Sequence, residues 1–221
     1  MKRIIHWALG VLGMLLSISL AVTLTLGARW LYVIVMERED IPEYTGYSRE
    51  EILANYDAVI KYNSVFGPEK LEFPTLPMSD GGRIHFEEVK VIFVALQFIG
   101  IASFVILAAY AAFAIVKKRK DALSVLRNTG ILSVAVPSAV GIGVALNWDM
   151  AFVIFHKIFF ANDLWLFDPY TDPVIRILPD TYFLACAVMI ISLVILSSIL
   201  CLTAYFILKK KTSGQPTVKS R

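Results

Sequence analysis

The sequence predicts an all-α membrane protein with four transmembrane helices and both termini in the cytoplasm. Composition is the first reason: 57% of the 221 residues are hydrophobic, 18% are charged, and the mean hydropathy is +0.68. Soluble globular domains carry more charge and less apolar surface. The second reason is that residues 4–28, 91–116, 129–146 and 181–208 contain no Asp, Glu, Lys or Arg. Each run is long enough to cross about 30 Å of hydrocarbon as a helix.

The first run follows Lys2 and Arg3 and has the start of a signal peptide. Its apolar stretch is longer than the core of about 7 to 15 residues that such peptides carry, so we expect an uncleaved anchor. The chain is then a single membrane domain over 1–221, with spans at about 4–35, 91–116, 129–147 and 181–208. Cys186 and Cys201 both fall in the last span, too far apart along one helix to pair.

Charge sets the predicted orientation. The N-terminus, the connection after residue 116 and the tail after residue 208 together carry 12 basic residues and one acid, a net charge of +11. The remaining charges sum to −8. The positive-inside rule therefore places the basic segments in the cytoplasm. These short runs beside the membrane suit anionic lipid and do not predict nucleic-acid binding.

The outer segments, 37–90 and 147–180, are too long to be simple turns. In the first, Ser48 and Glu51 have capping-box spacing and start an amphipathic helix over about 49–62. Residues 71–76 and 83–86 flank Ser79-Asp80-Gly81-Gly82, which predicts a β-hairpin. The alternative is that Asp80 already starts the second spanning helix.

The second outer segment begins with an aromatic-rich stretch from Trp148. If it is helical, Asp149 and His156 share one face and Phe152, Phe155 and Phe159 another, as in a helix lying at the membrane interface. Prolines then break 161–180 into turns, and Thr181 opens the last span.

Three histidines are the candidates for chemistry, and two of them lie outside. His6, beside Trp7, is interpreted as an anchor at the cytoplasmic interface. His85 and His156 come from different outer segments, and a histidine pair can divide the roles of general base and general acid near neutral pH. No ionisable residue lies in the middle of a span, which argues against transport.

Other catalytic chemistries have weaker support. There is no G-x-S-x-G elbow and no outer cysteine to act as nucleophile. A metal site would need the two outer histidines with carboxylates, but there is no H-E-x-x-H spacing. The carboxylates that could serve are Glu87, Glu88, Asp149 and Asp163.

Four motifs resemble those of a bacterial membrane-protein family. They are Ser79-Asp80 with His85 and Glu88-Val89-Lys90, then Phe155-His156-Lys157-Ile158-Phe159-Phe160, Asn162-Asp163-Leu164-Trp165-Leu166-Phe167-Asp168, and Ile177-Leu178-Pro179-Asp180-Thr181-Tyr182-Phe183. The sequence is similar to integral membrane proteins that include the lipoprotein intramolecular transacylase. The resemblance covers nearly the whole chain.

This resemblance implies an enzyme of the bacterial plasma membrane with its active site on the extracytoplasmic face. Its substrate would be a diacylated lipoprotein, whose sn-2 acyl chain moves to the α-amino group of the N-terminal cysteine and leaves the lyso-form lipoprotein. His85 and His156 would be the catalytic pair. The family implies neither a cofactor nor a metal, and no particular oligomeric state.

Further residues are candidates for supporting roles. Arg83 is a potential oxyanion donor, and Asp149 or Asp163, seven residues either side of His156, could orient its imidazole. Glu88 belongs to the first motif, and Trp165 to the interfacial aromatics. The competing hypothesis is a non-enzymatic membrane protein whose acidic outer segments bind a partner and whose histidines are structural.

Overall fold

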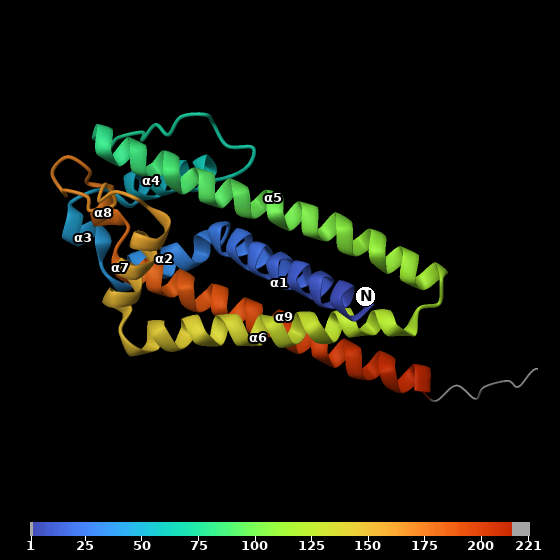
Figure 1. Ribbon diagram of the computed structural model, residues 1–221. Helices are drawn as coiled ribbons and strands as arrows, with labels where there is room; N and C mark the ends of the chain where they lie inside the picture. Colours follow the sequence, from blue (N-terminus) through green and yellow to red (C-terminus); the bar gives the residue numbers. More distant parts are fainter. Residues whose placement is uncertain (1, 214–221) are drawn as a thin grey trace, which may run out of the picture. The chain divides into compact units, whose positions relative to one another are not determined.

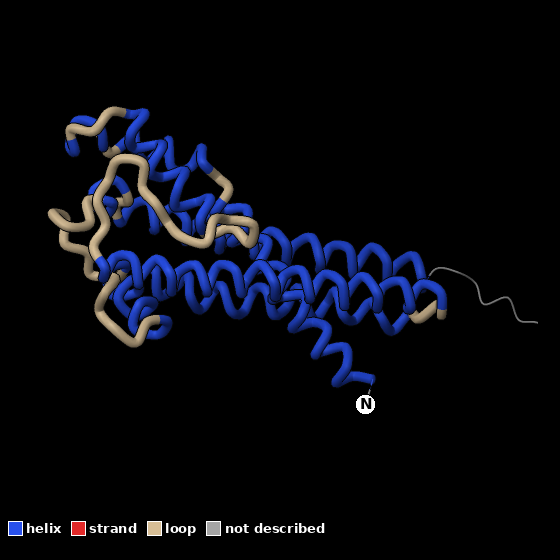
Figure 2. Tube along the Cα trace, turned by 90° about the horizontal axis from the view of Figure 1, so that it is seen from above, coloured by secondary structure: helices blue, strands red, loops and turns tan. Residues whose placement is uncertain are grey.

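The computed structural model describes residues 2–213 and consists of helices and loops, with no strand in that range (Figure 1, Figure 2). The long helices are α1 (Lys2–Leu26), α5 (Asp80–Val116), α6 (Leu123–Leu146) and α9 (Asp180–Ser213). The shorter elements are α2 (Arg29–Arg38), α3 (Ile41–Thr45), α4 (Arg49–Tyr62), the 3₁₀ turn η1 (Lys120–Ala122), α7 (Trp148–Phe159) and α8 (Val174–Ile177). Lys219 and Arg221, counted above among the cytoplasmic charges, lie outside the described residues.

The prediction of four spanning helices is confirmed. Helices over Lys2–Leu26, Asp80–Val116, Lys120–Leu146 and Asp180–Lys211 are long and apolar enough to cross a membrane. The first ends before the expected residue 35, because Gly27 and Ala28 interrupt it and α2 starts at Arg29. The Arg29 guanidinium donates to both carboxylate oxygens of Asp57, which ties the start of α2 to α4.

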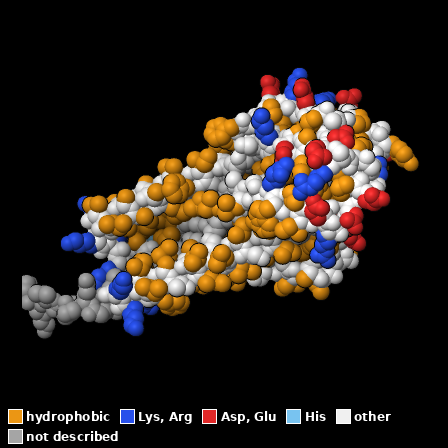
Figure 3. Space-filling view, turned by 180° about the vertical axis from the view of Figure 1, so that it is seen from behind, with side chains coloured by type: hydrophobic (Ala, Val, Ile, Leu, Met, Phe, Trp, Pro, Cys, Tyr) orange, Lys and Arg blue, Asp and Glu red, His pale blue; other side chains and the backbone are white. Residues whose placement is uncertain are grey.

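The surfaces of the long helices carry the apolar side chains that a bilayer requires. In the most apolar 18-residue stretch of α5, and likewise of α9, only 11% of the residues are buried within the protein. On the face drawn in Figure 3, apolar side chains cover long stretches of helix, and the Asp and Glu side chains gather in one region. Exposed examples on α5 are Phe98, Ile101, Phe104 and Val105. Lipid is the environment in which such a surface is stable.

The predicted outer helix is present as α4, with the expected capping box. The Ser48 hydroxyl accepts from the Glu51 backbone N–H, and the Glu51 carboxylate accepts from the Ser48 N–H. Inside α4, Asn55 is almost fully buried and bonds the segment that precedes α5. Its Oδ1 accepts from the N–H groups of Thr75 and Leu76.

The β-hairpin predicted around 71–86 is wrong, and the alternative start of a helix at Asp80 is confirmed. Ser79 is the reason, because its hydroxyl accepts from the Gly82 N–H at 2.9 Å and caps the first turn of α5. The backbone N–H groups of Thr75 and Leu76 donate to Asn55, so they are not available to pair with the second arm of the expected hairpin. His85 therefore lies on a helix.

The chain forms two compact units. Unit 2 comprises residues 22–98 and 142–189. Its core is centred on three buried tyrosines: the rings of Tyr32 and Tyr56 stack at 3.8 Å, and Tyr182 meets both edge to face. The Tyr32 hydroxyl donates to the Ile177 carbonyl, and the Tyr56 and Tyr182 hydroxyls bond each other at 3.0 Å. These bonds join α2, α4, α8 and the start of α9.

Unit 1 comprises residues 1–21, 99–141 and 190–221. Small residues allow its helices to approach closely, as is usual between transmembrane helices. A Cβ added at Gly10 of α1 would lie 2.7 Å from Asn128 Cβ and 3.3 Å from backbone atoms of α6. This contact therefore depends on the absence of a side chain.

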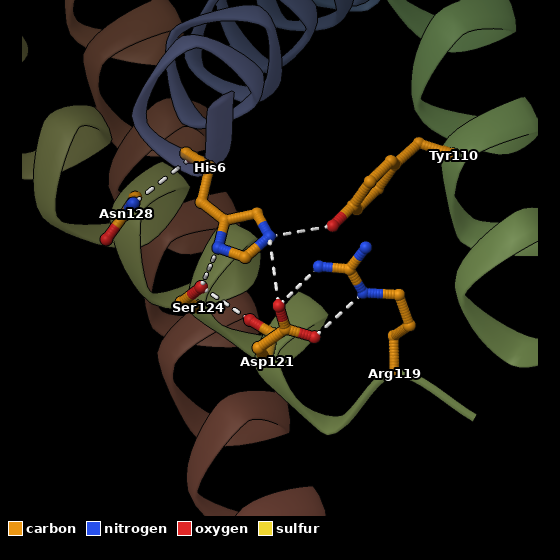
Figure 4. A network of polar contacts seen from close by, with 6 residues as sticks. All are labelled: His6, Tyr110, Arg119, Asp121, Ser124 and Asn128. Atoms are coloured by element: carbon orange, nitrogen blue, oxygen red, sulfur yellow. Dashed lines mark hydrogen bonds and ion pairs between the residues drawn. The ribbon is translucent and has the colours of Figure 1, made fainter. Parts of the chain in front are cut away.

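His6 is not a simple interfacial anchor, because it lies buried at the centre of a polar network in unit 1 (Figure 4). Its Nε2 lies 2.8 Å from the Tyr110 hydroxyl and its Nδ1 2.9 Å from Ser124 Oγ. Ser124 in turn donates to the backbone carbonyl of Asp121. Because the hydroxyl proton of Ser124 is used in that bond, Ser124 Oγ accepts from His6 Nδ1–H. In the neutral ring, Nε2 then accepts from the Tyr110 hydroxyl. The network joins α1, α5 and α6.

Replacing Gly10 with Ala is expected to destabilise the protein by about 1–3 kcal/mol, because the new methyl group overlaps α6 at backbone atoms that cannot rotate away. Gly143→Ala is the matched control, because Gly143 likewise lies inside a long helix, α6, and a Cβ there meets nothing within 4 Å. Thermal unfolding in detergent measures both. Equal Tm values for the two variants would contradict the close packing of α1 on α6.

Candidate active site

Unit 2 brings His85 and His156 together. His85 comes from the second turn of α5 and His156 from the last turns of α7. Their ring centroids are 6.1 Å apart with the planes inclined at 32°, and they are 6% and 8% exposed. Two imidazoles at this separation can contact the same small group.

The position of His85 follows from how α5 begins. The Ser79 N–H donates to Asp172 Oδ1 at 2.8 Å, and Thr171 Oγ1 donates to the other carboxylate oxygen. Asp172 is only 3% exposed and lies just before α8. Gly82 allows this approach, since a Cβ there would lie 2.2 Å from Asp172 Oδ1. A buried carboxylate thus holds the first turn of α5, one turn before His85.

A backbone hydrogen bond fixes the tautomer of His156. Nδ1 lies 2.7 Å from the Phe152 carbonyl oxygen, one helical turn back. A carbonyl can only accept, so Nδ1 carries the proton and the neutral ring has its lone pair on Nε2. The indole of Trp165 stacks on this imidazole at 4.5 Å. His156 therefore presents Nε2 as a base held in one orientation.

Aromatic rings enclose both histidines. Phe160, at the end of α7, contacts the His85 ring at 4.7 Å and the His156 ring at 5.6 Å. Phe167 meets His85 edge to face at 5.4 Å and stacks on Phe86. The two imidazoles thus lie in apolar surroundings, where water competes little for their nitrogen atoms.

Four buried polar atoms without a hydrogen-bond partner lie on the elements that form this site. In the described part of the chain, seven side-chain atoms are buried without a hydrogen-bond partner. Four of them lie on α5, α7 or the loop that follows α7: His85 Nδ1, Glu88 Oε2, Trp148 Nε1 and Trp165 Nε1. Such atoms are costly in a folded protein, and their concentration indicates a binding site for a ligand with donors and acceptors of its own.

Electrostatics favour the neutral form of His156. Burial, which penalises the imidazolium, lowers its pKa below the ordinary 6.5. The hydrogen bond to Phe152 and the negative charge of Asp180 both act to raise the pKa, and they offset burial only in part. His156 is therefore available as a base at neutral pH.

The remaining predicted site residues fall into two groups. Trp165 and Glu88 join the histidine site, the first by stacking on His156 and the second through Asn162. Arg83 is half exposed and pairs with Glu87 and Asp80 along the outside of α5. Asp149 and Asp163 are exposed, and the carboxylate that acts on the pKa of His156 is that of Asp180.

Of the carboxylates weighed for a metal site, Glu88 alone lies beside the histidines, and Glu87, Asp149 and Asp163 are exposed. Within residues 2–213, no three His, Cys, Asp or Glu side chains are placed to hold a metal ion together.

Several residues of the site are not predicted from the sequence. From the sequence, Phe160 and Phe167 are only interfacial aromatics or members of a motif, and Asn162 and Asp172 have no predicted role. The run Asn162-Asp163 shortly after His156 was the available signal, because a side-chain amide in a loop beside an aromatic helix commonly bonds the backbone or a neighbouring carboxylate.

Comparisons with known proteins agree with this geometry. The family model of the lipoprotein intramolecular transacylase Lit matches residues 7–183. The structure of Lit from Bacillus cereus superposes with a TM-score of 0.91 at 34% identity, covering 97% of this chain and 99% of that chain. The same protein with an H85A mutation gives a TM-score of 0.85 at 34% identity, covering 97% and 96%. No curated protein matches.

The pKa of His156 is expected to lie below 6.5 in an NMR titration of the protein in detergent, with its resonance assigned by its loss in His156→Gln. Asp180→Asn is expected to lower the pKa further, because it removes a negative charge that stabilises the imidazolium. A pKa of 6.5 or above, or an upward shift in Asp180→Asn, would contradict this electrostatic account.

Proposed function

Because the chain belongs to the lipoprotein intramolecular transacylase family, we propose that it moves the sn-2 acyl chain of a diacylglyceryl lipoprotein to the α-amino group of the N-terminal cysteine. The product is the N-acyl lyso-form lipoprotein. The observation that carries this proposal is the pair of buried imidazoles, 6.1 Å apart and surrounded by unpartnered polar atoms. The family match supports a transacylase activity, and the site supplies a base and a second imidazole.

The first step is attack of the amine on the ester carbonyl carbon. An α-amino group has a pKa of about 7.7–8.0 and attacks only when it is neutral. As the C–N bond forms, its proton passes to His156 Nε2, whose lone pair is free because Nδ1–H donates to the Phe152 carbonyl. The lowered pKa of His156 keeps this nitrogen unprotonated at neutral pH.

The second step is loss of the glycerol alkoxide. The C–O bond breaks, and the alkoxide takes one proton to become the free sn-2 hydroxyl. The proton taken up by His156 is proposed to reach the alkoxide by way of His85, which accepts it and passes one proton on, so that both rings end neutral. The ring of His85 lies next to that of His156, and its Nδ1 has no partner in the described protein. The proton that leaves the amine balances the one that reaches the hydroxyl, so no cofactor and no acyl-enzyme are required.

Stabilisation of the oxyanion between these steps needs hydrogen-bond donors that are not already used. Trp165 Nε1–H fits this role, since it is buried without a partner and its ring stacks on His156. Arg83 fits less well, because its guanidinium is half exposed and paired with Glu87 and Asp80.

The site is proposed to open to the outer leaflet of the bacterial plasma membrane. This proposal is supported by the positive charge of the segments that flank the spans on the opposite side from both histidines. On α7, one side is exposed and apolar, suited to acyl chains, while His156 is buried. The exposed residues are Met150, Ile154, Phe155, Ile158 and Phe159.

His85→Ala and His156→Ala are each expected to lower the rate of lyso-form production by at least about 100-fold, since each removes a proton-transfer group. The measurement is mass spectrometry of a synthetic diacylated lipopeptide incubated with purified protein and no added cofactor. His6→Gln serves as the control, because His6 belongs to unit 1 and its own network. Unchanged product in both alanine variants would refute the catalytic assignment.

Gly82→Ala is expected to reduce the same activity strongly, because its methyl group displaces Asp172 and with it the first turn of α5. The neighbouring Gly81→Ala places its Cβ no closer than 3.4 Å to Leu164 and should retain most activity. Comparing the two initial rates tests whether the start of α5 positions His85. Equal rates would show that it does not.

A further inference from the structure

Glu88 is a partly buried acid next to the histidine pair to which the proposed reaction assigns no role. It follows His85 by three residues on α5, so both side chains lie on the same side of the helix. Its Oε1 accepts from Asn162 Nδ2 at 2.9 Å, whereas Oε2 is buried and has no partner among the described residues. Half of this carboxylate is thus held by the protein and half is left for something else.

The cations that stand nearest to Glu88 in the sequence are occupied elsewhere. Arg83 pairs with Glu87 and Asp80. Lys90 donates to the Pro68 carbonyl and lies 4.3 Å from the centre of the Tyr62 ring. None of the ion pairs found among the described residues includes Glu88. A carboxylate oxygen that is buried without a partner is costly, so a positively charged hydrogen-bond donor for Oε2 is expected from the ligand.

Asn162 holds the carboxylate toward the reaction site. Its Oδ1 accepts from the Leu164 N–H at 3.0 Å, which fixes the amide so that Nδ2 faces Glu88. Trp165 follows Leu164 in the same loop, and its ring stacks on His156. Glu88 is therefore connected to both histidines, to His85 along α5 and to His156 through the Asn162 loop.

We propose that Glu88, positioned by Asn162, binds the α-ammonium group of the substrate before the amine is deprotonated. This inference rests on the proposed function, in which the acceptor nitrogen belongs to an N-terminal cysteine. An ammonium group supplies both the positive charge and the hydrogen-bond donors that Oε2 lacks. Two protons must leave this nitrogen: the ammonium gives the first to the Glu88 carboxylate, which passes it to solvent, and the neutral amine transfers the second to His156 as the C–N bond forms.

The same contact separates substrate from product by charge. Acylation converts the ammonium into an uncharged amide, which offers Glu88 one weak donor and no positive charge. The product thus loses the ion pair that holds the substrate, which favours its release. A lipopeptide whose amine is already acylated is disfavoured for the same reason, so the site selects free N-termini.

The test compares two non-reacting probes that differ only at nitrogen. Both are diacylglyceryl lipopeptides with an ether in place of the sn-2 ester, one with a free α-amine and one N-acetylated. Wild-type protein in detergent should bind the free amine about tenfold or more tightly, as expected for a charge-assisted contact. Glu88→Gln should lose this preference, and its isosteric amide can still accept from Asn162.

Glu87→Gln is the matched control. It makes the same change one residue earlier, on an exposed side chain that pairs with Arg83, and should retain the wild-type preference. If Glu88→Gln proves unstable by thermal unfolding, Asn162→Ala replaces it and should weaken the preference. Wild-type discrimination in the Glu88 variant, or in its replacement, would overturn the proposal.

The outcome for Glu88 is distinct from the outcome for the enzyme. If wild-type protein fails to acylate the free amine of the ester lipopeptide, the proposed function is wrong. If it acylates that amine while Glu88→Gln shows an unchanged KM and an unchanged preference for the amine probe, only the ammonium site is wrong. A raised KM with a smaller change in kcat supports a binding role.

Discussion

The buried carboxylate of Asp172 is the contact on which the arrangement of the site depends. It accepts from the Ser79 N–H at the start of α5, and Gly82 lies so close that no side chain fits between them. A helix held at its first turn has little freedom one turn later, where His85 lies. Asp172 comes from the chain just before α8, and α8 is bonded into the tyrosine core through Ile177. The core of unit 2 therefore sets the position of His85.

The second histidine is held by different means. His156 is bonded to its own helix at Nδ1, so Nε2 is a fixed acceptor. His85 has no partner at Nδ1 within the described protein and is held by packing against Phe160 and Phe167. In the proposed reaction His156 takes the proton from the amine, and His85 passes a proton to the leaving oxygen. Both rings lie among aromatic side chains, which lowers the competition from water.

The sequence predicts what local pattern determines. Charge-free runs give the four spanning helices, and the spacing of Ser48 and Glu51 gives α4 and its capping box. The hairpin prediction fails because Ser79-Asp80-Gly81-Gly82 fits both a turn and a helix start, and Asp172 and Asn55, which favour the helix, are remote in sequence. The anchor prediction for His6 fails for a related reason, since Tyr110 and Ser124 lie more than 100 residues away. The motifs that carry the family resemblance single out both outer histidines, whereas the unpartnered oxygen of Glu88 becomes visible only once Asn162 is placed beside it.

The central claim is that one substrate molecule supplies both the acyl chain and the amine. The most direct measurement mixes two diacylated lipopeptides of different peptide mass, one of which carries a deuterated sn-2 chain, and incubates them with the purified protein. Tandem mass spectrometry then locates the label. We predict that the deuterated chain appears only on the α-amino nitrogen of the peptide that first carried it. Deuterated chains on the amine of the other peptide, or no N-acylated product at all, would contradict the account.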